Sequence, residues 1–239
     1  MDFFTGNYHL AGLASAFFMA LSLSGLIVQV RFIWQRKKQR AAGRLAGELP
    51  TSALSLNRFA ASYFGFYALL VYGLCLQPLN HYLVWPRVLA EILLLAVFYA
   101  LWLDRRGLAP AMVLAAGVAL LLAAAALPAM SAAALLRSAA VAQALVVLSA
   151  LVFLQGAVHQ VVKIRREGRT GGLSLRMHQL SALKDTSLVL FGAAMGFGRG
   201  WPLLLIGGVS LAMQVVTMGH FHWARTSPAA RRRRAACRR

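Results

Sequence analysis

Long intervals without charged residues are the feature that most constrains this chain. Seven apolar intervals follow one another before a basic tail, and each is long enough to cross about 30 Å of hydrocarbon as a helix. We predict spans over residues 10–30, 59–76, 83–103, 108–128, 139–161, 177–197 and 201–223. Because only 13% of the residues are charged and 60% are hydrophobic, the composition predicts an all-α integral membrane protein and not a soluble one.

The basic residues indicate one orientation in the bilayer. They gather after the first, third and fifth intervals and in the tail, whereas the other gaps hold only Arg87, Arg137 and Arg199. Loops rich in Lys and Arg stay in the cytoplasm, so the pattern predicts an N-terminus outside and a C-terminus in the cytoplasm. The short loops and the high Ala and Arg content favour a bacterial inner membrane.

The net charge of +19 raises the question of a nucleic-acid partner. A groove that stacks bases interleaves basic with aromatic residues, whereas these charges flank apolar intervals. We therefore expect the lipid bilayer and no nucleic acid as a partner, with anionic lipid at the arginine run 231–234.

Four short landmarks occur twice in the same order, which indicates an internal repeat. The pairs are Val28-Gln29-Val30 with His159-Gln160-Val161, Ala53-Leu54-Ser55-Leu56 with Gly172-Leu173-Ser174-Leu175, Tyr72-Gly73 with Phe191-Gly192, and Trp85-Pro86 with Trp201-Pro202. Their offset falls from 131 to 119 to 116, so the length differences lie in loops. We predict a three-helix repeat over 8–106, a linker helix over 107–130, a second three-helix repeat over 136–224 and a basic cytoplasmic tail over 225–239.

With these landmarks the chain resembles the PQ-loop superfamily, which includes the SWEET sugar transporters and lysosomal amino-acid exporters. The shared features are a Gln at the inner end of the first and fifth helices, Leu-Ser-Leu at the start of the second and sixth, and Trp-Pro at the start of the third and seventh. The resemblance implies seven helices in a 3+1+3 architecture, with two parallel bundles joined by the linker helix and transport by alternating access.

The chain departs from that family at two points. Val28 and His159 stand where the family has the proline of its Pro-Gln dipeptide, which implies a different hinge or a smaller movement. SWEET sugar sites use an Asn on the third helix of each repeat, and neither 83–103 nor 201–223 contains one. A neutral sugar is therefore disfavoured as the substrate.

Three ionisable side chains fall well inside predicted spans, namely Glu91, Lys184 and Asp185. Such charges cost several kcal/mol unless they are paired or hydrated, and they often mark solute or proton pathways. Lys184 and Asp185 are neighbours that point about 100° apart on a helix, so we expect them to make a poor pair, with Glu91 as the candidate counter-ion of Lys184. The alternative is a bridge of Lys184 with Glu91 or Asp185 that only docks the two halves.

The types of these three side chains favour certain solutes. A buried ammonium beside a carboxylate suits an amino acid or an organic acid, which carries matching charges. Desolvation favours the protonated form of a carboxyl group, which suits coupling to protons.

The remaining candidates lie near the ends of the predicted spans. Gln29 and Gln160 would form an inner gate or pack between helices. Trp85 and Trp201 fit an aromatic belt or an outer gate, and His178, near the cytoplasmic boundary, is expected to be solvated. We find no catalytic motif, no metal-ligand cluster and no cofactor motif, so we expect neither an enzyme nor a cofactor.

Together these features predict a membrane transporter of a small polar solute, with an amino acid or an organic acid favoured. One alternative is a SWEET-like sugar transporter. The other is a receptor or membrane assembly component that keeps the fold without transporting, which the missing prolines and the Arg-rich tail favour. The sequence is compatible with a monomer or a homo-oligomer.

Overall fold

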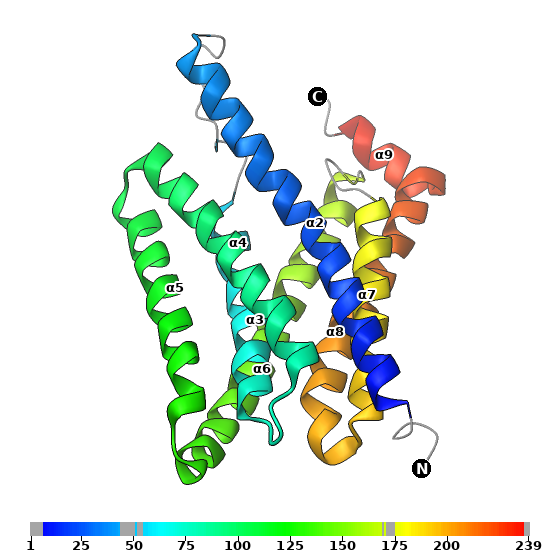
Figure 1. Ribbon diagram of the computed structural model, residues 1–239. Helices are drawn as coiled ribbons and strands as arrows, with labels where there is room; N and C mark the ends of the chain where they lie inside the picture. Colours follow the sequence, from blue (N-terminus) through cyan, green and yellow to red (C-terminus); the bar gives the residue numbers. More distant parts are fainter. Residues whose placement is uncertain (1–6, 44–50, 52–54, 169, 171–174, 237–239) are drawn as a thin grey trace. The chain divides into compact units, whose positions relative to one another are not determined.

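The computed structural model describes residues 7–43, 51, 55–168, 170 and 175–236, and within them the chain is helical with short connections (Figure 1). The all-α prediction is confirmed for this part of the chain, and each predicted span coincides with one helix apart from residues at its ends. Residues 53–54 and 172–174 of the repeat landmarks, and 237–239 of the tail, lie outside the described residues. The helices are α2 (Tyr8–Ala41), α3 (Leu56–Cys75), α4 (His81–Arg105), α5 (Leu108–Ala126), the short 3-10 helix η1 (Leu127–Ala129), α6 (Ala132–Glu167), α7 (Leu175–Ala194), α8 (Phe197–Thr226) and α9 (Pro228–Ala236).

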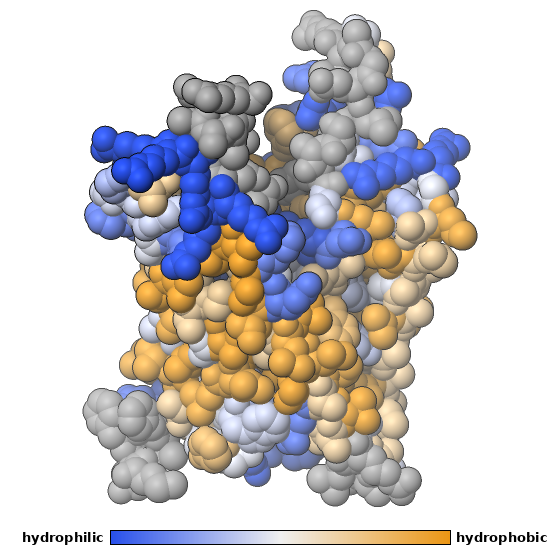
Figure 2. Space-filling model, turned by 180° about the vertical axis from the view of Figure 1, so that it is seen from behind, coloured by the Kyte–Doolittle hydropathy of each residue, from blue (hydrophilic) through white to orange (hydrophobic). Residues whose placement is uncertain are grey.

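Six of the described helices are long and apolar enough to cross a membrane: α2, α3, α4, α5 together with η1, α6 and α8. Many of their large apolar side chains are exposed, among them Leu10, Leu108 and Leu122, and apolar atoms cover much of the face in Figure 2. These features are those of a membrane protein. The helix α7 is not among the six because Lys184, Asp185 and several hydroxyl and amide side chains lower its hydropathy, so its span stays a prediction.

The helices α2 and α6 continue beyond the predicted spans on the basic side. The last turn of α2 contains Lys38 and Arg40, and that of α6 contains Arg165 and Arg166. Cations near a helix C-terminus interact favourably with the helix dipole, so the basic residues extend these helices instead of ending them.

Residues Met19–Val146 form one compact unit, called unit 2 here, in which α3, α4 and α5 pack against one another. Met19 and Leu23 of α2 pack on Ala90 of α4. The Tyr63 hydroxyl donates a 2.6 Å hydrogen bond to the Gly117 carbonyl, which joins α3 to α5.

Residues Met1–Phe18 and Val147–Arg239 form a second compact unit, called unit 1 here, in which α7 and α8 pack most extensively. Gly196, with φ of 75°, makes the tight connection between them. The two backbones approach so closely that a Cβ atom on Gly200 would overlap the Gly192 carbonyl. Glycine is therefore required at this crossing.

The hairpin α3–α4 in unit 2 and the hairpin α7–α8 in unit 1 have matching bounds. The helices α3 and α7 each contain 20 residues, and their first and last residues are both 119 positions apart. The helices α4 and α8 begin 116 positions apart, and the sixth residue of each is a proline, Pro86 or Pro202. Gly73 lies against Leu83 in the first hairpin, and Gly192 lies against Leu203 in the second. The helix bounds thus follow the sequence offsets, with a connection three residues shorter in the second hairpin.

The close approach of α7 and α8 leads to a stability prediction. Gly200→Ala should lower the free energy of unfolding by about 1–3 kcal/mol, because the added methyl group forces the two backbones apart. Gly198→Ala is the matched control, since a Cβ atom there meets nothing within 4 Å and alanine favours the helix. Thermal unfolding of both purified variants in detergent measures the difference, and equal midpoints would contradict the assigned packing.

Candidate functional site

A charged cluster lies between α7 and α8 in unit 1. Asp185 is only 1% exposed, and both of its carboxylate oxygens have partners. Lys184 Nζ donates to Oδ1, and Ser210 Oγ donates to Oδ2 over 2.6 Å. The carboxylate is therefore compensated by one cation and one hydroxyl group.

The expectation that Lys184 and Asp185 would make a poor pair is wrong. Adjacent Cα–Cβ bonds do diverge by about 100°, but the four-carbon stem of lysine is flexible enough to bring its ammonium back to the neighbouring carboxylate. Glu91, the candidate counter-ion of Lys184, has no hydrogen-bond partner among the described residues.

A second polar pair lies on the same two helices, about two turns from the first along α7 and one turn along α8. His178 Nδ1 and Gln214 Oε1 are 2.5 Å apart, and the imidazole ring also packs edge-on against Phe221. His178 precedes Asp185 by seven residues and Gln214 follows Ser210 by four, so the two pairs lie along one stripe.

The predicted solvation of His178 is also wrong, because the residue is only 8% exposed. Its Nε2 atom is buried and has no hydrogen-bond partner among the described residues. The position near the end of a predicted span suggested contact with water, but the neighbouring helix α8 covers the ring.

Glu91 of α4 is fully buried in the structure, with an exposed fraction of 0%. The phenol groups of Tyr63 and Tyr67 on α3 are close enough to interact with it electrostatically. One turn earlier on α4, Arg87 is only 2% exposed. Arg87 was counted with the outer loop charges although the predicted span 83–103 contains it, and its spacing of four residues from Glu91 was the signal that could have placed both side chains on one helix face.

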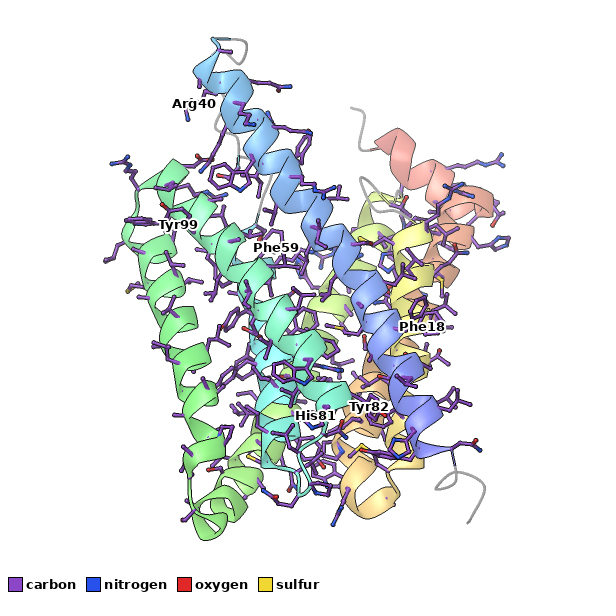
Figure 3. All side chains as sticks on the ribbon, in the orientation of Figure 1. Phe18, Arg40, Phe59, His81, Tyr82 and Tyr99 are labelled. Carbon is purple, nitrogen blue, oxygen red and sulfur yellow. The ribbon has the colours of Figure 1, made fainter. Side chains whose placement is uncertain are left out.

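The predicted gate residues lie on four different helices. Gln160 of α6 is half-buried, and its amide nitrogen has no partner among the described residues, whereas the side chain of Gln29 on α2 lies outside the described part. Trp85 and Trp201 are each the fifth residue of their helix. Trp85 is 63% exposed and its indole N–H donates to His81 Nδ1 over 3.2 Å, at the end of α4 marked by His81 in Figure 3. An exposed indole near a helix start fits a membrane interface.

Within the basic tail, residues Pro228–Ala236 form the helix α9, which contacts the ends of α6 and α8. Arg233 donates to the carbonyl of Arg165 and lies 5.9 Å from the ring centre of Trp223. Arg231 and Arg232 are exposed, and hydrophilic atoms gather at this end of unit 1, at the upper left of Figure 2. The described residues contain no group of His, Cys, Asp and Glu that could hold a metal ion.

No family model, no curated protein and no solved structure matches this chain. The features that bear on function are therefore the matching hairpins and the buried charges.

The ion pair between α7 and α8 can be tested by a double-mutant cycle. Asp185→Leu should destabilise the protein by about 3–5 kcal/mol, because it leaves the Lys184 ammonium without its partner. The double variant Lys184→Met with Asp185→Leu should recover most of this loss, since apolar residues of similar volume replace such pairs at little cost. Ser210→Ala, which removes one hydrogen bond, should cost about 1 kcal/mol. Denaturation in detergent is measured for the native protein, Lys184→Met, Asp185→Leu, the double variant and Ser210→Ala, and simple additivity of Lys184→Met and Asp185→Leu would exclude the pair.

Proposed function

We propose that this protein is a PQ-loop-like membrane transporter that moves a small polar solute, an amino acid or an organic acid. The observation that carries the proposal is the burial of ionisable side chains within otherwise apolar helices. Glu91 is fully buried on α4, and Asp185 and His178 are buried on α7. Groups of this kind are costly inside a membrane and are found mainly where solutes or protons pass.

The composition of α7 supports its role as the seventh span. A helix that lines a polar pathway needs apolar side chains only where it faces lipid, and the exposed large side chains of α7 include Leu180, Leu183 and Leu190. Ser187, Ser210 and Thr217 add hydroxyl groups along the α7–α8 pair. In this proposal α7 lines the pathway, and the bundles 8–106 and 136–224 move relative to one another to open it to either side in turn.

The polar stripe on α7 and α8 also suits proton movement. Asp185 can accept a proton, Ser210 can relay one, and His178 can exchange one at its unpartnered Nε2. Coupling of solute flux to a proton gradient is therefore part of the proposal.

A non-transporting receptor or assembly component is the second candidate. It is favoured by α9, whose exposed Arg231 and Arg232 project from a docked helix and could contact a partner or anionic lipid. A sugar transporter has no comparable support, because α4 and α8 both lack Asn.

The seven-span proposal predicts where the termini lie. An odd number of spans puts the N-terminus outside and the C-terminus in the cytoplasm, whereas six spans would put both on one side. Reporter pairs fused to each end, such as alkaline phosphatase and a fluorescent protein, should give opposite signals in bacterial cells. Equal signals from the two ends would show that α7 does not cross.

Transport is tested by uptake into proteoliposomes of labelled amino acids, organic acids and sugars, with and without an inward proton gradient. We expect saturable uptake of an amino acid or an organic acid that increases with the gradient. Asp185→Asn and Lys184→Ala should each reduce it about tenfold or more, since each leaves a buried group without its charged partner. Sugar flux indifferent to the gradient and to both changes would contradict the proposal, and the absence of all flux would favour the receptor.

A further inference from the structure

The helix α4 carries two buried charges of opposite sign on one face. Arg87 and Glu91 are four residues apart, so their side chains leave the helix in nearly the same direction, one turn apart. Both are buried inside unit 2. Charged residues are almost never buried this completely unless something compensates them.

Neither charge has adequate compensation within the described residues. The Tyr63 hydroxyl lies beside Glu91, but its single proton is donated to the Gly117 carbonyl, so neither oxygen of Glu91 receives a hydrogen bond. Nε of Arg87 also lacks a partner. Arg87 Nη1 makes only long contacts, 3.4 Å to the Tyr82 carbonyl and 3.3 Å to the Leu83 carbonyl, at the start of its own helix. The guanidinium is thus directed away from Glu91, and no hydrogen bond joins the two groups.

Packing of the hairpin does not require these charges. At the offset of 116 that relates α4 to α8, the positions equivalent to Arg87 and Glu91 hold Leu203 and Gly207, which are both buried. In the first hairpin the close contacts of Gly73 are made by Leu83 and Val84, and not by Arg87 or Glu91. The charged pair is a property of the first hairpin alone, which points to a ligand and not to the scaffold.

We infer that Arg87 and Glu91 bind the two charged ends of a zwitterionic solute of the α-amino acid class. The planar guanidinium of Arg87 provides paired N–H donors for a carboxylate, and the free oxygens of Glu91 accept from an ammonium group. The pair Lys184 and Asp185 is already mutually compensated, so it holds no free charge for the solute. This inference rests on the proposed function and names the substrate class and the residues that select it.

Binding to the purified full-length protein in lipid nanodiscs tests the inference. The probe is a pool of radiolabelled protein amino acids. The unlabelled competitors are amino acids, and analogues with the same side chains that keep only the amine or only the carboxylic acid. We expect saturable binding that amino acids compete for and that compounds with a single charged end do not. Arg87→Leu and Glu91→Gln should each weaken binding about tenfold or more. Asp104→Asn is the matched control, because it removes from α4 a carboxylate that pairs with Lys37 over 3.6 Å, and it should leave binding unchanged.

Folding of the variants is checked by thermal unfolding. Arg87→Leu should fold because Leu203 occupies the equivalent position of α8. Arg87→Lys keeps the positive charge but loses the paired N–H donors of the planar guanidinium, so it should bind the amino acid more weakly than the native protein. The absence of saturable binding, binding indifferent to Arg87→Leu and Glu91→Gln, or equal competition by amines or acids would overturn the inference.

Uptake into proteoliposomes separates the two proposals. Amino-acid uptake that persists unchanged in Arg87→Leu and Glu91→Gln would keep the transporter and overturn this site. Binding that depends on both residues without any uptake would keep the site and replace the transporter by a receptor for the same class of solute.

Discussion

The cost of removing charge from water is the constraint on which this structure depends. An α-helix makes its backbone hydrogen bonds within itself, so an apolar helix can cross a bilayer without polar partners from other segments. Each buried side-chain charge then needs a partner, a proton or a ligand. In unit 1 the partner is present, because Asp185 receives Lys184 and Ser210. In unit 2 the oxygens of Glu91 have none among the described residues.

The hairpins α3–α4 and α7–α8 have matching helix bounds but carry their charges at different positions. Glycines at equivalent positions, Gly73 and Gly192, allow each pair of helices to approach closely. The charges do not follow this symmetry, since the first hairpin carries them on α4 and the second on α7. At the offset of 119, the positions equivalent to Lys184 and Asp185 are Gly65 and Phe66. The two hairpins thus share helix bounds and a close glycine contact, but not the positions of their buried charges.

The sequence predicted the helices well because uncharged intervals and basic flanks are direct consequences of the bilayer. It missed the extension of α2 and α6, since it treated basic residues as loop, although they also stabilise helix ends. Glu91, Lys184 and Asp185 could be picked out as charges in apolar surroundings. Arg87 was overlooked because charges were counted by loop, although the span 83–103 contains it, and the burial of His178 could not be predicted because the sequence does not show which helix covers its ring. The partner of each buried charge depends on side-chain conformation, which the spacing of residues along a helix does not determine.

The balance of charge in the buried pairs narrows the class of solute further. Arg87 with Glu91, and Lys184 with Asp185, are each neutral as pairs. A zwitterion adds no net charge to such surroundings, so its main cost is the loss of its own hydration, which both ends recover against Arg87 and Glu91. An organic acid would leave one negative charge in a medium of low dielectric constant, where isolated charges are most costly. It would therefore need a proton to neutralise its charge on entry, whereas an amino acid would need one only as the source of energy for uptake. Dependence of flux on the proton gradient thus carries information about the charge of the solute as well as about the energy source.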